Sequence, residues 1–174
     1  MKRKINNYLT FVDNPEDVVY LNSKLFPVNM RLFKSSRDYK NFIICACSVI
    51  EDYLRAHYED YSRPYGMSGA NCAIPFNIIA FYQNRGEKDE RVITMLNPKI
   101  IRRSGTCVKA KSNCGSVRLK KEICVNRHES VTVVWYDLQG KKRRGIFKRE
   151  DGGFTVQHEI DHNAGVLITH RRQA

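Results

Sequence analysis

The stretch TVQHEIDHNAGVLI, from Thr155 to Ile168, restricts the fold of this chain more than any other part of the sequence. It contains His158 and His162, four residues apart, and Glu159 directly follows the first histidine. On an α-helix, residues i and i+4 project from the same face, so both imidazoles can reach one metal ion with Glu159 beside it. We therefore expect a helix here, beginning in the preceding glycine pair and ending at Gly165, a residue type common at helix C-termini.

The alternative is a solvated helix that carries two surface histidines. The chain has only five histidines, which disfavours a chance occurrence of this spacing. A catalytic metal site usually has three protein ligands and one open position. After His162 the sequence contains no Asp or Glu, and His170 is the only further candidate. The third ligand is therefore expected upstream, where a cysteine thiolate suits a transition metal.

The size of the chain, 174 residues, predicts a single domain that spans residues 1–174. Hydrophobic residues make up 42% of it, enough for a core. No apolar run is long enough to span a membrane, and the N-terminus lacks the pattern of a secretory signal. The six cysteines are therefore expected as reduced thiols in a cytoplasmic protein.

The chain is basic, with 30 Lys and Arg against 18 Asp and Glu and a formal net charge of +12. Such an excess favours contact with nucleic acid or another polyanion. The basic residues are scattered, except in KKRRGIFKR, residues Lys141 to Arg149, and no RNA-binding signature accompanies them. A basic surface with loose attraction to RNA or the ribosome is the reading we prefer over a dedicated RNA-binding module.

The segment from Ser35 to Asp60 predicts one long helix, with Ser35 or Ser36 as its N-terminal cap. It includes the longest apolar run, Phe42 to Ile50, which is too short for a membrane span and indicates a buried helix. Apolar residues recur at helical spacing along it and are expected to face the core: Phe42, Ile43, Cys47, Ile50 and Leu54.

The middle of the chain is predicted to form mainly β-strands. Tyr61–Gly69 is expected as a loop, because it is rich in Ser, Pro and Gly. The predicted strands are Ala73–Tyr82, Arg91–Arg103 with a bend at Asn97-Pro98, and a hairpin over Glu129–Lys148 that turns at Leu138–Lys141, with Gly140 at positive φ. An early helix, several strands and a final helix indicate an α+β fold rather than a doubly wound sheet.

The motifs together resemble those of the peptide deformylases. QHEIDHNAG, from Gln157 to Gly165, matches every fixed residue of that family's Q-H-E-x-D-H signature and its following glycine. SNCGS (Ser112–Ser116) lies where the family has E-G-C-L-S, and VITMLNPKII (Val92–Ile101) resembles its L-I-N-P strand. The resemblance extends over about Gly66–Ile168, including a hairpin with a D-x-x-G-x turn. It implies antiparallel sheets around a central C-terminal helix that carries H-E-x-x-H.

The resemblance also implies a metal held by Cys114, His158 and His162. Cys107 is the competing sulfur, but the position of Cys114 relative to the other motifs fits the family better, and Gly-Ser follows it. The implied ion is Fe²⁺, with Zn²⁺, Ni²⁺ or Co²⁺ able to take its place. Three other cysteines are expected to pack in the core: Cys45, Cys47 and Cys124.

The implied reaction is hydrolysis of the N-formyl group from formyl-methionyl peptides. Glu159 would take a proton from the attacking water and pass it to the leaving amine. The backbone N–H of Gly115 would stabilise the developing oxyanion. Ser112 stands where the family has a glutamate, which puts the rigidity of the site in question.

The family's first motif, G-x-G-L-A-A-x-Q, is poorly kept in GMSGANCA, residues Gly66 to Ala73. Ser68 replaces its second glycine, and Ala73 replaces the glutamine whose amide helps to hold the oxyanion. Loss of such a donor typically lowers the rate by about a hundredfold or more. Asn71 is the candidate substitute, since on a strand an offset of two keeps it on the same face, whereas the Cys72 thiol is a weak donor.

An apolar pocket for the methionine side chain is expected near Gly66, Gly69, Phe154 and Thr155. For Asp161, two interpretations stay open: it orients an arginine or a backbone group behind the histidines, or it is a solvated carboxylate.

Two rival functions remain. One is a deformylase-like protein that keeps the metal but has weak or altered activity, and the other is a basic RNA- or ribosome-binding module with a vestigial site. A general H-E-x-x-H peptidase is disfavoured by the missing downstream ligand. The expected partners are formyl-methionyl nascent peptides, with no membrane and a monomeric state.

Overall fold

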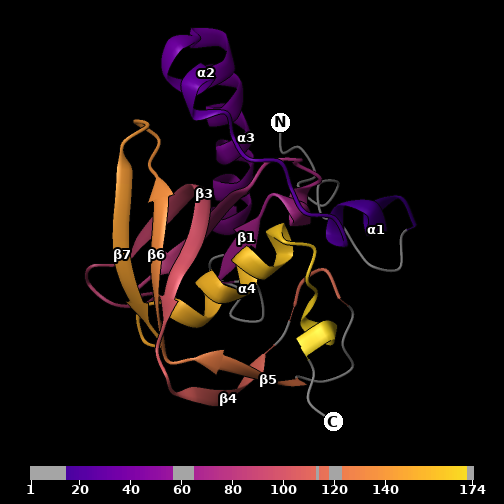
Figure 1. Ribbon diagram of the computed structural model, residues 1–174, viewed down its shortest axis with the longest axis vertical. Coiled ribbons are helices and arrows are strands. Elements are labelled where there is room, and N and C mark those ends of the chain that lie inside the picture. The colour runs from indigo at the N-terminus through magenta and orange to yellow at the C-terminus, as the bar shows by residue number, and fades with distance from the viewer. Residues whose placement is uncertain (1–14, 57–64, 113, 118–122, 172–174) are drawn as a thin grey trace.

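The computed structural model describes residues 15–56, 65–112, 114–117 and 123–171 (Figure 1). Its helices are α1 (Pro15–Leu21), α2 (Met30–Ser35), α3 (Arg37–Ala56) and α4 (Gly153–Asn163), with short 3-10 turns η2 (Ala70–Cys72) and η3 (Ile168–Arg171). None of the helices in these residues has the length and apolar character needed to cross a bilayer.

The strands form two separate antiparallel sheets. The five-stranded sheet has the order β1-β2-β3-β6-β7, and the two-stranded ribbon pairs β4 with β5. The strand bounds are β1 Gly66–Ser68, β2 Ile78–Gln83, β3 Arg91–Arg103, β4 Cys107–Ser112, β5 Ile123–His128, β6 Ser130–Tyr136 and β7 Lys142–Lys148. The expected α+β architecture, with antiparallel sheets around a C-terminal helix, is thereby confirmed.

Helices α3 and α4 cover opposite faces of the five-stranded sheet. Ile78 and Ala80 of β2 belong to the core cluster that contains the buried residues of α3. Ile79 and Phe81, the alternate residues, belong to the cluster that includes Val156 of α4. Successive side chains of a strand point to opposite faces, so both faces of β2 are buried and its sequence is continuously apolar. On its other side α4 is hydrogen-bonded through Gln157 to the β4–β5 ribbon, so the helix lies between the sheet and the ribbon (Figure 1).

The predicted long helix is present as α3, but it begins at Arg37 and ends at Ala56, and residues 57–60 lie outside the described part of the chain. Ser36 caps it by accepting a hydrogen bond from the N–H of Tyr39 at 3.3 Å, whereas Ser35 is the last residue of α2. Four of its five predicted core positions are buried. Phe42 is the exception: it is 57% exposed, because it lies off the buried stripe, and its ring contacts Phe76 instead.

Two predictions around β2 were wrong. The strand begins at Ile78 and not at Ala73, because Ala73 has a left-handed φ of 52° and Pro75 has no N–H to give to a sheet. Gly66–Ser68 forms strand β1 rather than a loop, since its backbone pairs with the edge of β2.

The long strand and the hairpin were predicted correctly. β3 covers Arg91–Arg103 and bends at Asn97, which has a φ of 53° and lies at a shift in register. β6 and β7 form the hairpin, and Gly140 in its turn has a φ of 80°. Helix α4 ends at Asn163, two residues earlier than expected, and Gly165 follows with a φ of 74°.

The sequence did not predict the β4–β5 ribbon or the helices α1 and α2. Along β5, buried and exposed residues alternate from Ile123 to Arg127. Polar side chains on the exposed face, and lysines on β4, give the segment a loop-like composition although its backbone is fully paired. The ribbon matters for function because the chain between β4 and β5 includes Cys114.

Candidate metal centre

Helix α4 presents two imidazoles one turn apart. Nε2 of His158 lies 3.2 Å from Nε2 of His162, and the two rings meet edge to face with centroids 4.6 Å apart. Two glycines also allow α4 to pack closely against β1 and β7. A Cβ at Gly66 would lie 2.5 Å from Thr155 Cγ2, and one at Gly153 would lie 2.6 Å from backbone oxygens of β7.

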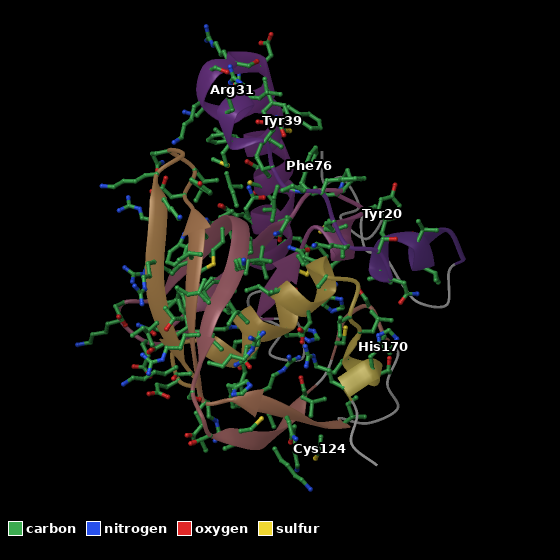
Figure 2. All side chains as sticks on the ribbon, in the orientation of Figure 1. Tyr20, Arg31, Tyr39, Phe76, Cys124 and His170 are labelled. Carbon is green, nitrogen blue, oxygen red and sulfur yellow. The ribbon has the colours of Figure 1, made fainter. Side chains whose placement is uncertain are left out.

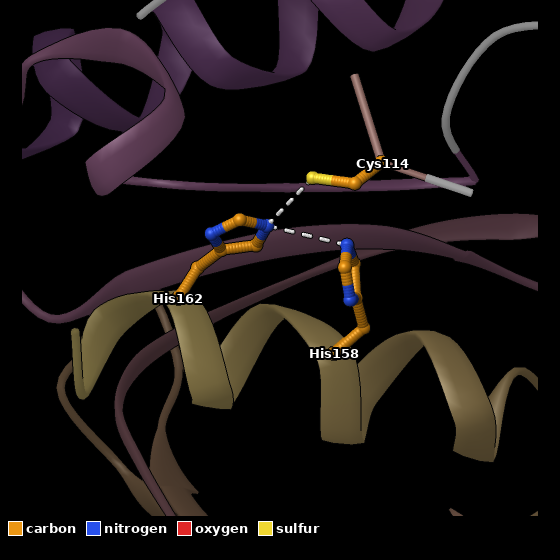
Figure 3. A group of neighbouring side chains, drawn as sticks. All are labelled: Cys114, His158 and His162. Carbon is orange, nitrogen blue, oxygen red and sulfur yellow. Dashed lines mark hydrogen bonds between the residues drawn. The ribbon is translucent and has the colours of Figure 1, made fainter. Parts of the chain in front are cut away.

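The sulfur of Cys114 completes the cluster from the other side. Sγ lies 3.2 Å from Nε2 of His162, and the three potential ligand atoms all lie within 4.8 Å of one another (Figure 3). Cys114 and His162 are buried, and His158 is half-buried. Cys107, the competing candidate, is exposed at the start of β4 and is not part of the cluster.

The remaining sequence candidates for sulfur and nitrogen ligands lie elsewhere. His170 is exposed in η3 (Figure 2), and its Nδ1 accepts the N–H of Leu167, the residue before this turn, at 3.2 Å. None of the six cysteines, which all lie in the described ranges, forms a disulfide. Cys47 packs in the core, but the prediction was wrong for Cys45 and Cys124, which are exposed on the outer sides of α3 and the ribbon.

Both imidazoles are in a setting that keeps them neutral. Burial, then the neighbouring His162 and Arg127, lower the pKa of His158 well below its ordinary value. Burial also lowers the pKa of His162 to about 4, against the opposing effect of Asp161. A neutral imidazole has a free nitrogen lone pair, which is the form that binds a metal. Nδ1 of His162 is buried without a hydrogen-bond partner among the described residues.

The Cys114 thiol is held in its protonated form unless a cation is near. Burial raises its pKa to about 12, the backbone N–H groups of Ser116 and Val117 lower it in part, and the charge of Glu159 raises it. A bound metal ion reverses this balance, because it stabilises the thiolate directly. The donor set of one sulfur and two imidazoles therefore fits a transition-metal ion.

Glu159 is a buried acid beside this cluster. It is 3% exposed, and burial raises the pKa of its carboxyl to about 8, although Arg127 acts in the opposite direction. Oε2 has no hydrogen-bond partner among the described residues. In its ionised form, a buried carboxylate with this high proton affinity and one unengaged oxygen is suited to accept a proton from a bound molecule.

Arg127 of β5 is a site residue that sequence reasoning missed. It is buried, pairs with the carboxylate of Asp161, and places NH2 3.4 Å from Nδ1 of His158. Arg171 of η3 also holds Asp161, with Nε 2.6 Å from Oδ2 and NH2 2.7 Å from Oδ1. The interpretation of Asp161 as a carboxylate that orients an arginine is thus confirmed. The alternation of buried and exposed residues along β5 could have indicated that Arg127 is buried, but β5 was not predicted as a strand.

Gln157 ties α4 to the ribbon. Its Oε1 accepts the N–H of His128 at 3.0 Å, and its Nε2 donates to the carbonyl of His128 at 2.8 Å. The side chain thus satisfies both backbone groups at the end of β5 and fixes how the ribbon meets the helix.

The first motif has a different backbone from the one predicted. Asn71 lies in the turn η2 and not on a strand, so the same-face argument does not apply. Its side chain is buried: Oδ1 accepts from Ser68, and Nδ2 donates to Ser116 Oγ at 2.9 Å. Ala73 is exposed. Burial, and then Glu159, raise the pKa of the Cys72 thiol to about 12.

The other predicted site residues lie around this centre. Gly115 is exposed, directly after Cys114. Gly66 is packed against α4, and a Cβ there would lie 3.0 Å from Glu159 Cγ; one at Gly69 would lie 2.4 Å from the carbonyl oxygen of Phe76. Phe154 is half-buried in the first turn of α4, under the guanidinium of Arg149 at 5.5 Å from the ring centre.

In a comparison with known protein families, residues 18–174 match the family model described as polypeptide deformylase. A peptide deformylase of Chloroflexus aggregans is 38% identical over 79 residues, which cover 44% of this chain and 40% of that protein. One of Enterococcus faecalis is 36% identical over 124 residues, which cover 68% of this chain and 66% of that protein. The matched stretches thus span less than two thirds of the length of these two relatives.

The fold is also that of a solved deformylase. The Met-Ala-Ser-bound structure of a class I type b peptide deformylase from Acinetobacter baumannii superposes with a TM-score of 0.75 and 21% identity, and the alignment covers 94% of this chain and 97% of that one.

Proposed function

This chain belongs to the peptide deformylase family, and we propose that it is a metal-dependent hydrolase that removes the formyl group from N-terminal formyl-methionine. The observation that carries this proposal is the meeting of Cys114, His158 and His162 beside the buried acid Glu159. The relatives named peptide deformylase do not favour the alternative of a metal-binding protein with weak or altered activity.

The proposed metal ligands are Sγ of Cys114 and Nε2 of His158 and His162. We propose Fe²⁺ as the ion, with Zn²⁺, Ni²⁺ or Co²⁺ able to occupy the same ligands, because all four bind nitrogen and sulfur donors. Such an ion supplies Lewis acidity, which lowers the pKa of a water and polarises the carbonyl of the substrate.

Glu159 is proposed as the general base and then the general acid. Its unengaged oxygen takes a proton from the attacking water, the new C–O bond forms at the formyl carbon, and the C–N bond breaks. The same carboxyl returns the proton to the leaving amine, so the products are formate and a peptide with a free N-terminus. The burial of Glu159 favours this exchange, since it keeps the proton affinity of the carboxylate high.

Two groups are proposed to stabilise the oxyanion. The first is the backbone N–H of Gly115, which lies next to the ligand Cys114 on an exposed turn. The second is the Nδ2 group of Asn71, which has two hydrogens and gives one of them to Ser116. Of the two, Asn71 is proposed to replace the amide donor that is lost at Ala73.

For the substrate we propose formyl-methionyl peptides of nascent chains, as the tripeptide Met-Ala-Ser bound to the Acinetobacter relative suggests. Gly66, Gly69 and Phe154 are proposed to contribute to the binding surface. The two glycines do so through their backbone, because neither position has room for a side chain.

A basic sheet face supports a proposal of loose RNA or ribosome attraction. On the face that α3 covers at β2, strand β7 exposes Lys142, Arg144 and Lys148. Val134 of β6 is the register partner of both Arg144 of β7 and Lys99 of β3, so the two basic residues lie in one row across the sheet. Lys99 is also exposed. Among the described positions of β3, β6 and β7 that share this face, none is acidic. A cluster of this sign attracts the phosphates of RNA.

We also propose a monomeric, cytoplasmic protein in which residues 1–174 form one domain. A formate-release assay on formyl-Met-Ala-Ser, with metal content measured on the same sample, tests the main proposal. Metal-dependent formate release by the wild type, and its loss in Glu159→Gln with the metal retained, is the expected result. A metal-loaded wild type that releases no formate overturns the proposed activity.

A further inference from the structure

The proposed ligands of the metal centre come from two parts of the fold that share no strand pairing. The histidines are on α4, which packs against the five-stranded sheet, whereas Cys114 lies in the connection between β4 and β5 of the separate ribbon. The position of the sulfur relative to the imidazoles therefore depends on how the ribbon is fastened to the rest of the molecule.

The far end of the ribbon is fastened to α4 by side chains of the helix. Gln157 holds the backbone of His128, and Asp161 holds Arg127. These contacts are at the C-terminal end of β5. The β4–β5 connection, which contains the sulfur of Cys114, is therefore positioned by other contacts.

Asn71 supplies a polar contact at that connection. It is 5% exposed, and its Nδ2 donates to Oγ of Ser116, which is 2% exposed and two residues after Cys114. The backbone N–H of Ser116 in turn donates toward the Cys114 sulfur. A short path of hydrogen bonds therefore leads from η2 to the sulfur.

Ser68 determines which way the Asn71 amide faces. The backbone N–H of Ser68 lies 2.8 Å from Asn71 Oδ1, and the Ser68 hydroxyl lies 2.5 Å from the same atom. A backbone N–H can only donate, so the atom facing it must be the oxygen. The amide nitrogen is consequently left for Ser116. Ser68 itself is fully buried at the end of β1.

We infer that Ser68, Asn71 and Ser116 form a positioning unit that holds the Cys114 sulfur against the two histidines. The inference rests on the proposed metal site and deepens it. It also explains two departures from the family motif together: Ser68 and Asn71 replace a glycine and an alanine, and the structure joins them in one hydrogen-bonded unit. Asn71 acts through Ser116, and therefore has a positioning role that is separate from oxyanion stabilisation.

The test is a Co²⁺ titration of the metal-free full chain in the absence of substrate. The absorption band of thiolate-to-cobalt charge transfer reports on the sulfur ligand, and the titration gives the affinity. Ser116→Ala and Asn71→Ala each remove one side of the hydrogen bond, and the double variant completes a cycle. Thr94→Val is the matched control, because it deletes another buried hydroxyl, bonded to Glu51, on the α3 side of the sheet.

Each single variant is expected to bind Co²⁺ about 10- to 100-fold more weakly, as is typical when a group behind a metal ligand is lost. The charge-transfer band should shift or weaken as well. The double variant should lose little more than either single variant, since both act through one contact. Thr94→Val should keep wild-type affinity and spectrum. If Asn71→Ala does not fold, Ser116→Ala alone decides the question.

Ser116→Ala with wild-type Co²⁺ affinity and an unchanged band overturns the positioning unit. So does a double variant whose loss is the full sum of the two single losses. A wild-type protein that shows no thiolate-to-cobalt band at all overturns the proposed metal site instead, so the two failures are distinguishable. Because no substrate is present, an effect of Asn71 on the oxyanion cannot produce the result.

Discussion

Sγ of Cys114 lies 3.2 Å from Nε2 of His162, although 48 residues separate the two in the sequence. The contact joins the ribbon to α4 at the point where His158 also presents its Nε2. Three potential ligand atoms that lie within 4.8 Å of one another, on side chains that are buried or half-buried, form an arrangement that a metal ion stabilises.

Metal binding should stabilise the fold, and the effect should depend on Cys114. We expect the melting temperature of the metal-free protein to rise when Co²⁺ or Zn²⁺ is added, by an amount set by the ratio of free metal to Kd. In Cys114→Ser this rise should be largely lost. Cys107→Ser is the matched control, because its thiol is exposed and outside the cluster. Equal metal-dependent shifts in the two variants, measured by calorimetry, would contradict the ligand assignment.

Glu159→Gln should separate catalysis from metal binding. The substitution keeps the shape of the side chain but removes the proton acceptor, so we expect formate release to fall by about 10²–10⁴-fold. Metal content should stay at the wild-type value, since Glu159 is not a proposed ligand. Kinetics and elemental analysis on the same samples provide the measurement. A variant that retains more than a tenth of wild-type activity would rule out Glu159 as the base.

Arg127 and Arg171 both pair with Asp161 but should differ in their contribution to stability. Arg127 is 4% exposed, and removal of one partner from a buried pair typically costs about 3–5 kcal/mol. Arg171→Met should cost about 0–1 kcal/mol, because its side chain is 42% exposed and solvent screens the pair. We expect Arg127→Met toward the lower end of its range, since Arg171 still compensates Asp161. Urea unfolding measures both, and equal losses would show that burial does not decide the difference.

Gly66→Ala should disturb the site through packing alone. The added Cβ would lie 2.5 Å from Thr155 Cγ2 and 3.0 Å from Glu159 Cγ, so these side chains of α4, or the helix itself, have to shift. Overpacking of this kind typically costs about 1–3 kcal/mol, and the shift of Glu159 should also reduce formate release. Gly105→Ala serves as the control, because a Cβ at that position meets nothing within 4 Å. A Gly66→Ala protein with wild-type stability and activity would refute this account of the close approach.

RNA binding, if it uses the basic sheet face, should depend on charge position and not only on net charge. Fluorescence anisotropy with a single-stranded RNA should show weaker binding and a smaller salt dependence for Lys142→Glu/Arg144→Glu. Lys109→Glu/Lys111→Glu changes the net charge equally from exposed positions on β4, and should have a smaller effect. His158→Ala should bind RNA like the wild type. Identical losses in the two double variants would indicate a general charge effect.

Local sequence patterns were sufficient for the helix that carries His158 and His162 and for the hairpin turn at Gly140. The i, i+4 spacing and the turn glycine act over a few residues, so neighbours in the chain decide them. The bend of β3 at Asn97 could be predicted for the same reason, because the Asn97-Pro98 pair is also a local feature. The preference for Cys114 over Cys107 came from motif order in the chain, and the structure places Cys114, alone of the two, beside the histidines.

The contacts around Arg127 and Asn71 were decided only when the chain folded. Arg127 reaches His158 and Asp161 because β5 pairs with β4, and Asn71 reaches Ser116 across 45 residues because η2 and the ribbon meet. Neither partner choice is encoded by spacing: a buried polar group pairs with whichever donor or acceptor packing brings within reach, because leaving it unpaired costs free energy. Local spacing therefore indicated the two histidine ligands, and motif order indicated Cys114, whereas packing between distant segments selected the groups that hold these ligands in place.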